Sequence, residues 1–290
     1  MVNIAILGFG TVGSGVAEVL TRNGGLIDGR VNNQVRLKYI MRARDIFEGP
    51  YKDLFVKDFS IIERDPEVSI VVETIGGVGA ALDYTTRALK AGKSVVTANK
   101  ELVAAHGYEL LQLAKEHGVS YLFEASVGGG IPILRPLNAC LAANEVDQVT
   151  GILNGTTNYI LTRMIKAGLT FDQALKEAQA NGYAEQDPTA DVDGHDACRK
   201  TCILAALSFG QHIYPDQVPT QGIRGVSLAD VAYADSCGYK IKLLGRAIRE
   251  PEGKVCAFVA PHLVSCENPL AGVEDVFNAI SVTGNAVGDV

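Results

Sequence analysis

Apolar and polar positions follow two alternating periods along the first half of the chain. Short apolar runs bounded by turn residues predict strands at residues 3–7, 35–41, 69–73, 94–97 and 120–124. Apolar positions three or four residues apart predict helices at 11–21, 80–91 and 100–117, the last capped by Asn99, and the polar stretch 23–33 predicts a loop. Strands that alternate with helices indicate a doubly wound parallel sheet, so we expect an α/β fold class with an N-terminal Rossmann-like domain.

The second half of the chain has a different order of elements. Its pattern predicts a helical stretch at 157–180, a helix at 194–209, and strands near 240–248, 255–264 and 278–282. This mixture is typical of an α+β domain. We therefore expect two domains, one over residues 1–134 and one over residues 135–290, which a length of 290 residues also favours.

Composition narrows the classes of function. A formal net charge of −7 argues against a nucleic-acid binder, whose surface is basic. The chain starts without the basic region of a signal peptide, and no apolar run reaches the roughly 18 residues of a membrane helix, so we expect a cytoplasmic protein. The six cysteines then indicate reduced residues of the core. Cys198, Cys202 and the nearby His195 suggest a zinc site as an alternative, but packing is the favoured interpretation.

A glycine-rich turn joins the first predicted strand to the first predicted helix. Gly8, Gly10 and Gly13 form the G-x-G-x-x-G motif in the context where it binds a dinucleotide. Gly8 permits a tight turn, Gly10 lets the backbone approach a pyrophosphate, and Gly13 allows the helix to pack on the strand. The phosphates would face the positive end of the helix dipole, where Thr11 and Val12 begin the helix.

The end of the second predicted strand is where such folds distinguish NAD from NADP. An acidic residue there binds the ribose 2′-hydroxyl, whereas an arginine accommodates a 2′-phosphate. This chain has Arg42, Arg44 and Asp45. The two arginines favour NADP, and Asp45 leaves NAD or use of both open.

Five carboxylates precede one lysine in the segment 182–200. Asp193 is placed to cap the helix that follows, and a calcium loop is excluded because Lys200 stands where its bidentate glutamate should be. Asp196 and Lys200 lie one turn apart on a helix that is apolar nearly all round, which predicts a buried pair at a cleft floor and a lysine suited to proton transfer. The alternative is a solvated pair at a helix start.

Three further segments carry polar groups at turns. Lys100 follows the predicted strand 94–97, and Glu124 with a run of glycines follows the next strand. Both therefore lie at the carboxyl edge of one sheet, where α/β folds bind ligands. The segment 154–158 opens a helix with several polar donors. Each of these is also compatible with ordinary turn chemistry.

Together these segments resemble homoserine dehydrogenase. The resemblance rests on motifs that run in order from residue 8 to residue 200: GFGTVGSG (8–15), ETIGG (73–77), VVTANKELVA (95–104), FEASVGGGIPI (123–133), GILNGTTNYIL (151–161) and YAEQDPTADVDGHDACRK (183–200). It implies reversible NAD(P)-dependent reduction of L-aspartate 4-semialdehyde to L-homoserine, on the route to threonine, methionine and isoleucine. Hydride would pass directly from the cofactor, so no covalent nucleophile is required.

The resemblance also implies roles for single residues. Lys200 matches the proton donor and acceptor, and Lys100 matches a second lysine that contacts cofactor and substrate. The substrate-binding carboxylates match Glu185, Asp191 and Asp196. The motif and the resemblance together predict cofactor binding by Gly8, Gly10, Thr11, Val12, Gly13, Arg42, Gly76, Lys100 and Gly182. A monovalent cation site, usually sodium, matches Glu124 and the carbonyl oxygens of Val127, Gly129 and Ile131.

The resemblance further implies a homodimer formed through the second domain, and the apolar strand 255–259 is compatible with that. The partners expected are a small-molecule substrate and a second copy of the chain, with no nucleic acid and no membrane. Homoserine dehydrogenases continue past the strand that closes this chain into a glycine-rich segment and a helix that returns to the nucleotide domain. The resemblance therefore implies either a chain truncated at its C-terminal end or a cofactor cleft left partly uncovered, and we expect weaker cofactor retention than in a longer chain.

Two alternative functions are open to the same sequence. Aspartate-semialdehyde dehydrogenase acts on the same aldehyde but acylates a cysteine, and none of the six cysteines lies in a glycine-flanked loop after a predicted sheet strand. A redox sensor with a Rossmann module and a DNA-binding domain would carry a basic helix-turn-helix segment, which the sequence lacks. Oxidation of NADPH by aspartate semialdehyde without phosphate, with homoserine as product, would separate all three.

Overall fold

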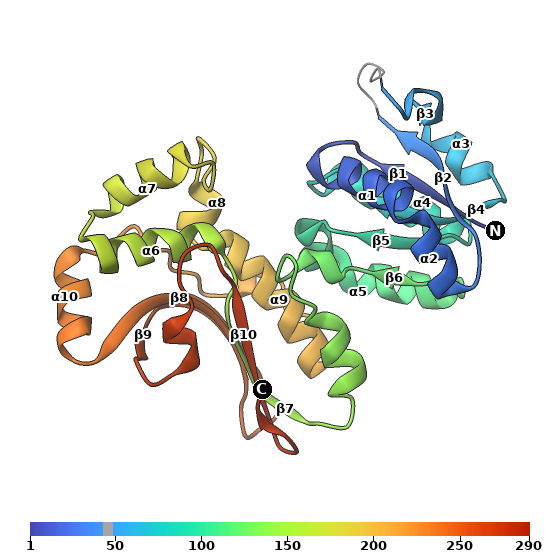
Figure 1. Ribbon diagram of the computed structural model, residues 1–290. Coiled ribbons are helices and arrows are strands. Elements are labelled where there is room, and N and C mark those ends of the chain that lie inside the picture. Colours follow the sequence, from blue (N-terminus) through green and yellow to red (C-terminus); the bar gives the residue numbers. More distant parts are fainter. Residues whose placement is uncertain (43–48) are drawn as a thin grey trace. The chain divides into compact units, whose positions relative to one another are not determined.

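The computed structural model describes residues 1–42 and 49–290, and these form two compact units, Met1–Ser126 and Val127–Val290 (Figure 1). This division falls a few residues before the predicted boundary at residue 134. Two-domain organisation therefore follows the sequence pattern, and the functions expected of each domain stay predictions.

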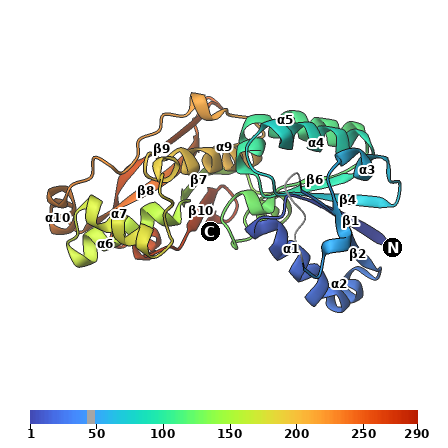
Figure 2. The same ribbon diagram turned by 90° about the horizontal axis from the view of Figure 1, so that it is seen from above.

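The first unit contains a parallel sheet in the order β3-β2-β1-β4-β5-β6. Its strands are β1 (Val2–Leu7), β2 (Val35–Met41), β3 (Phe55–Val56), β4 (Val68–Glu73), β5 (Ser94–Thr97) and β6 (Tyr121–Leu122). Its helices are α1 (Thr11–Arg22), α2 (Gly24–Val31), α3 (Phe59–Arg64), α4 (Gly79–Lys90) and α5 (Lys100–Glu116). Helices α1 and α2 lie on one face of the sheet and α4 and α5 on the other (Figure 2). The predicted doubly wound sheet is confirmed.

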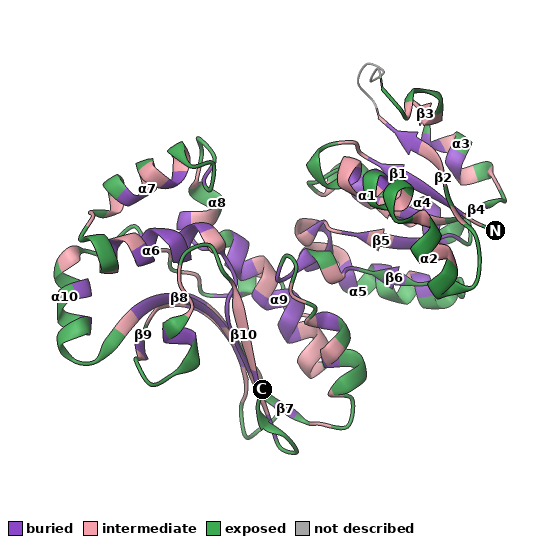
Figure 3. Ribbon diagram, viewed as in Figure 1, coloured by how far each residue is buried: buried purple, intermediate pink, exposed green. Residues whose placement is uncertain are grey.

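Helices on both faces explain why the residues 4–7 of β1 are a continuous apolar run. Ala5, Ile6 and Leu7 have no exposed surface, and Figure 3 shows the buried centre of the sheet between exposed outer helix faces. The chain runs outward from β1 through β2 to β3 and then returns to β4 on the other side of β1, so the strand order reverses beside β1. Such a reversal is where open α/β sheets bind ligands.

One prediction for this unit is wrong, and another is confirmed only in part. The expected loop at 23–33 contains helix α2, which ends at Asn32 in the left-handed conformation with φ 49°. Its three glycines give poor helix propensity, but the Asp28 carboxylate accepts hydrogen bonds from the Val35 N–H (2.8 Å) and from Arg36 (2.8 Å), which tie the helix to β2. The strand expected at 120–124 is shorter, because the 3-10 turn Glu124–Ser126 follows β6.

The second unit contains an antiparallel sheet in the order β11-β10-β7-β8-β9. Its strands are β7 (Val146–Ile152), β8 (Tyr239–Arg249), β9 (Val255–Ser265), β10 (Ala279–Gly284) and β11 (Gly288–Asp289). Its helices are α6 (Gly155–Ala167), α7 (Phe171–Ala180), α8 (Thr189–Val192), α9 (His195–Phe209) and α10 (Leu228–Ser236). Helices α6, α9 and α10 all contact β8. The α+β class is confirmed.

The helical stretch expected at 157–180 is two helices. Gly168, with φ +64°, ends α6, and Thr170 starts α7 with a capping box to Gln173. Strand β7 has no counterpart among the predicted elements. Its segment contains Asp147, Gln148 and Gly151, which are poor strand formers, and the sheet partners on both sides supply the pairing that its composition does not.

Helix α9 packs very closely on the sheet. A Cβ on Gly245 of β8 would lie 2.1 Å from the Thr201 hydroxyl oxygen, so only a glycine permits this approach.

Strand β8 also carries a buried lysine. Lys242 is 1% exposed and donates to the Asn158 side-chain oxygen at 3.1 Å and to the Val273 carbonyl oxygen. Removal from water lowers the pKa of Lys242 to about 8.

The cysteines only partly match expectation. All six are free, and Cys198 and Cys202 are buried on α9. The other four are exposed, so assigning them to the core was wrong: Cys140, Cys237, Cys256 and Cys266. In the described part of the chain, every helix is too short or too polar to cross a bilayer.

Two glycines of α1 give a matched test of the close packing at the start of that helix. A Cβ on Gly13 would lie 2.2 Å from the Gly8 carbonyl oxygen, whereas a Cβ on Gly15 would have no heavy atom within 4 Å. We expect Gly15→Ala to stabilise the protein by about 1 kcal/mol through helix propensity. Gly13→Ala should destabilise it by about 1–3 kcal/mol through overpacking. Urea unfolding checks both, and equal stability of the two variants would contradict the packing.

Candidate active site

The turn between β1 and α1 is shaped by glycine. Gly8 has φ +93°, and a Cβ there would lie 2.8 Å from the Thr74 carbonyl oxygen. The Thr74 hydroxyl donates to the Leu7 carbonyl oxygen at 3.0 Å, which joins the turn to the end of β4. The tight turn expected of Gly8 and the close helix packing expected of Gly13 are thus confirmed as structural roles.

The start of α1 is open. Gly10 is its N-cap without a side-chain hydrogen bond, and no heavy atom lies within 4 Å of where a Cβ on Gly10 would stand. Thr11 and Val12 are exposed. Backbone N–H groups at a helix start have no intrahelical partner and suit a phosphate. These residues fit the pyrophosphate of a dinucleotide.

Three more of the expected cofactor residues follow strands of the same sheet. Arg42 comes directly after β2, Gly76 lies in the loop after β4 with φ +82°, and Lys100 begins α5 after β5. The strands are parallel, so their carboxyl ends share one edge, as the sequence predicts. Arg44 and Asp45, which bear on the choice between NAD and NADP, lie outside the described residues.

A buried carboxylate connects two of these loops. Glu73 has no exposed surface and accepts hydrogen bonds from the Thr97 hydroxyl at 2.5 Å and from the Ile75 N–H at 2.7 Å. Asn99 donates to the Gly77 carbonyl oxygen at 2.6 Å and caps α5 through the Leu102 N–H at 3.1 Å, which confirms the predicted cap. Sequence reasoning missed Glu73, although a carboxylate that ends an otherwise apolar strand is the signal that could have found it.

In the second unit, the structure brings Asp196 and Lys200 together on α9. The Lys200 Nζ donates to the Asp196 Oδ2 and to the Leu153 carbonyl oxygen, both at 2.7 Å. Only 13% of the lysine side chain and 5% of the aspartate side chain are exposed. The predicted burial is confirmed for Asp196 and holds in part for Lys200, which is partly buried, and the solvated alternative is wrong. The ammonium is held by groups from two elements, since Leu153 directly follows β7.

Asp191 joins this cluster through an asparagine. The Asn154 Nδ2 donates to the Asp191 Oδ1 at 2.7 Å and to the Asp196 Oδ2 at 2.9 Å. Asp191, Asp196 and Lys200 together carry a formal charge of −1. A surplus carboxylate beside a buried lysine suits a ligand that carries an ammonium group. Sequence reasoning attributed the segment 154–158 to turn chemistry or polar donors and did not single out Asn154.

Other expected residues lie in the loop between α7 and α8. Gly182 has φ +75° and is exposed, and the Glu185 side chain is also exposed. The loop is held to α6 and α7, because Thr156 donates to the Tyr183 carbonyl oxygen at 2.8 Å and Gln179 donates to the Glu185 carbonyl oxygen at 3.0 Å. The Glu185 carboxylate is therefore carried by an anchored backbone while its side chain faces solvent.

The expected cap at Asp193 is wrong. Gly194, with φ +85°, is the N-cap of α9 and makes no side-chain hydrogen bond. The Asp193 carboxylate instead accepts from Arg224 at 2.6 Å. The backbone at 192–193 is pressed against Gly222, where a Cβ would lie 2.1 Å from the Val192 carbonyl oxygen. The close contact with Gly222 and the ion pair with Arg224 hold the backbone before α9, where the sequence predicts a side-chain cap.

The segment 124–131, where the resemblance implies a cation site, runs from the end of the first unit into the start of the second. Gly128 and Gly129 have φ +77° and +60°, and the Ile131 N–H donates to the Gly128 carbonyl oxygen at 3.0 Å. Consecutive left-handed glycines form a turn that exposes carbonyl oxygens, the ligands that hard cations prefer. Within the described ranges, no group of three His, Cys, Asp or Glu side chains is arranged to hold a metal, so the zinc alternative at His195, Cys198 and Cys202 finds no support.

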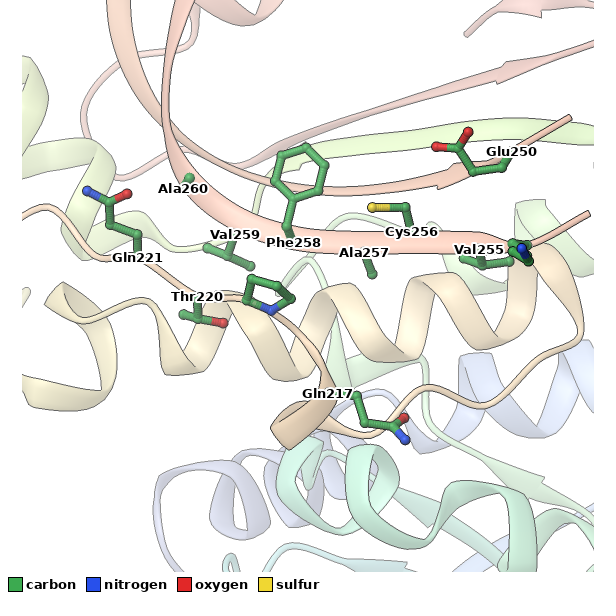
Figure 4. A pocket seen from close by; sticks show the side chains of 12 residues that line it. Gln217, Thr220, Gln221, Glu250, Val255, Cys256, Ala257, Phe258, Val259 and Ala260 are labelled. Atoms are coloured by element: carbon green, nitrogen blue, oxygen red, sulfur yellow. The ribbon is translucent and has the colours of Figure 1, made fainter. Parts of the chain in front are cut away.

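A separate groove follows the edge strand of the second sheet. Figure 4 shows it between β9 and the segment 217–221, with Val255, Ala257 and Val259 among the residues that line it. The Val259 N–H donates to the Pro219 carbonyl oxygen at 2.9 Å, and its carbonyl oxygen accepts from Gln221 at 2.8 Å. No residue expected at the active site lines this groove.

Comparison with known protein families identifies both units. The family model for homoserine dehydrogenase matches residues 132–290, and the model for the NAD-binding domain of homoserine dehydrogenase matches residues 8–124. A homoserine dehydrogenase of Lactococcus lactis is 43% identical over 99% of this chain and 68% of its own length.

Solved structures agree with the sequence matches. The homoserine dehydrogenase of S. aureus superposes with a TM-score of 0.88 at 44% identity, over 100% of this chain and 69% of that protein. A hyperthermophilic archaeal homoserine dehydrogenase in complex with NADPH gives a TM-score of 0.81 at 29% identity, over 100% of this chain and 90% of that protein. With the nucleotide turn and the buried Asp196–Lys200 pair both in place, this chain belongs to the homoserine dehydrogenase family, the NAD(P)-dependent oxidoreductases of amino-acid biosynthesis.

Proposed function

We propose that this chain catalyses the reversible reduction of L-aspartate 4-semialdehyde to L-homoserine by direct hydride transfer, with Lys200 as the proton donor and acceptor. The observation that carries the proposal is the Lys200 ammonium, which belongs to a side chain only 13% exposed and is held at 2.7 Å by both Asp196 and the Leu153 carbonyl oxygen. A fixed ammonium can give a proton to an aldehyde oxygen as that oxygen gains charge. In the reverse direction the same lysine, as a free amine, would accept the hydroxyl proton.

NAD(P)H, when bound, supplies the hydride. Its pyrophosphate would be held by the open start of α1, from Gly10 to Val12, beside the turn at Gly8 and Gly13. Gly76, Lys100 and Gly182 would contact the cofactor elsewhere. Arg42 is half-buried at the end of β2, where it would meet a ribose 2′-phosphate, and this supports a preference for NADP over NAD.

The substrate is an amino acid, so its ammonium group needs carboxylates. Glu185, Asp191 and Asp196 are the carboxylates of the second unit that we assign to it, with Asp196 shared between the substrate and Lys200. Lys100, at the first turn of α5, is assigned to cofactor and substrate contacts. Binding of the substrate ammonium, away from the reacting carbonyl group, would orient the aldehyde for the transfer of the hydride and of the proton.

Three further features belong to the proposal. A monovalent cation, most simply sodium, would be held by Glu124 and the carbonyl oxygens of Val127, Gly129 and Ile131, and the left-handed turn at Gly128 and Gly129 supports this. A homodimer would form through the second unit, whose edge strand β9 is apolar at 255–259. We also assign the protein to the cytoplasm, where this biosynthesis takes place.

Removal of the lysine tests the proposal. Lys200→Ala should lower kcat by about 10²–10⁴-fold, the range for loss of a positioned general acid. The Kd for NADPH, measured by fluorescence, should stay within about two-fold, since the glycine turn lies in the other unit. Lys176→Ala, at an exposed position of α7, is the charge-matched control and should keep full activity. Near-normal turnover of Lys200→Ala would overturn the assignment.

Arg42→Ala tests the cofactor preference. Loss of a charged hydrogen bond to a 2′-phosphate costs about 1.5–3 kcal/mol, so KM for NADPH should rise about 10-fold or more while KM for NADH stays the same. Arg36→Ala removes the same charge from the same strand, where Arg36 pairs with Asp28 at 2.8 Å, and should not change the ratio of the two KM values. An unchanged ratio in Arg42→Ala would contradict the preference for NADP.

A further inference from the structure

Asn154 stands where three parts of the candidate site meet. It follows β7 by two residues and is the N-cap of α6. The residue is 5% exposed, and both polar atoms of its amide have partners. The Oδ1 accepts from the Thr157 N–H at 2.8 Å and from the Thr157 hydroxyl at 3.0 Å, while the Nδ2 donates to Asp191 and Asp196. Because both ends of the amide are bound, its orientation is fixed.

The two carboxylates need a donor between them. Asp191 Oδ1 and Asp196 Oδ2 lie 2.7 Å and 2.9 Å from one nitrogen atom, so the two oxygens are close to each other. Like charges at such a distance repel, and burial strengthens the repulsion. The two N–H bonds of a primary amide, one directed to each oxygen, offset this repulsion without adding a charge.

A neutral donor also preserves the charge of the site. A lysine or arginine at position 154 would cancel the surplus carboxylate that the substrate ammonium requires, and an aspartate would add a second one. The Asp196 Oδ2 accepts from both Asn154 and Lys200, at 2.9 Å and 2.7 Å. Any movement of Asn154 would therefore be passed to the oxygen atom that holds the Lys200 ammonium.

We propose that Asn154 is a positioning residue of the reaction, which fixes the Asp196 carboxylate between Asp191 and Lys200 and thereby sets the place of the Lys200 ammonium. This inference rests on the role proposed for Lys200. Asn154 would not itself contact the hydride or the reacting proton. Its loss should change kcat and the KM for the substrate, because Asp196 and Lys200 would be displaced. Cofactor binding, which we assign mainly to the first unit, should not change.

Two substitutions separate this role from that of a helix cap. Asn154→Asp and Asn154→Ser both keep an oxygen that can cap α6, and both lose the amide donor. We expect each to lower kcat by about 100-fold, the cost of misplacing a reacting group by about 1 Å, with an unchanged Kd for NADPH. The carboxyl group introduced by Asn154→Asp can donate again once it is protonated, so the ratio of kcat in Asn154→Asp to kcat in Asn154→Ser should rise as the pH falls.

The control is Asn268→Asp, which changes another asparagine cap in the same unit. Asn268 accepts from the Leu270 N–H at 2.9 Å and should keep full activity as aspartate. In a Lys200→Ala background, Asn154→Ser should cause little further loss, since it acts through the lysine. Wild-type kcat in both Asn154 variants would overturn the inference for Asn154 alone. Normal turnover of Lys200→Ala would instead overturn the proposed function.

Discussion

The ion pair between Asp196 and Lys200, with a buried carboxylate and a partly buried ammonium, is the constraint at which several elements of the second unit meet. Removing two charges from water costs several kcal/mol each unless geometry and hydrogen bonds compensate. Here the compensation comes from three directions: the Leu153 carbonyl after β7, the Asn154 amide at the start of α6, and α9 itself. Gly245 lets α9 approach β8 closely, since a Cβ there would lie 2.1 Å from the Thr201 hydroxyl oxygen of α9. The sheet, two helices and one loop thus converge on a single ammonium group.

The first unit achieves its positioning differently, by backbone shape. A Cβ on Gly8 or Gly13 would clash with backbone oxygen atoms, so the turn admits no side chain at either position. The start of α1 next to it is open. The buried Glu73 then holds the loops after β4 and β5 through Ile75 and Thr97. Many proteins bind a dinucleotide through this geometry, whereas the charged cluster of the second unit is the part to which we assign specificity for an amino acid substrate.

The sequence predicts most of the fold, because its strongest signals are long and periodic. The parallel sheet, the cap at Asn99 and the buried face of α9 follow from hydrophobic spacing and cap residues alone. Helix α2 and strand β7 could not be predicted, since their glycines and polar residues oppose the conformations that tertiary hydrogen bonds and sheet partners impose. The site residues that the family resemblance implies stay predictions. Asn154 and Glu73 escaped prediction because they depend on contacts between segments distant in sequence, which spacing does not show.

A double-mutant cycle on Asp196 and Lys200 tests the central claim that the two act as one unit. The rates to compare are kcat of Asp196→Asn, of Lys200→Ala and of the double variant, each at saturating NADPH and aspartate semialdehyde. If the carboxylate acts by holding the ammonium, the double variant should be about as slow as Lys200→Ala alone, because residues that act as a unit are strongly non-additive. Losses that multiply in the double variant would show that the two side chains act independently and would contradict the account.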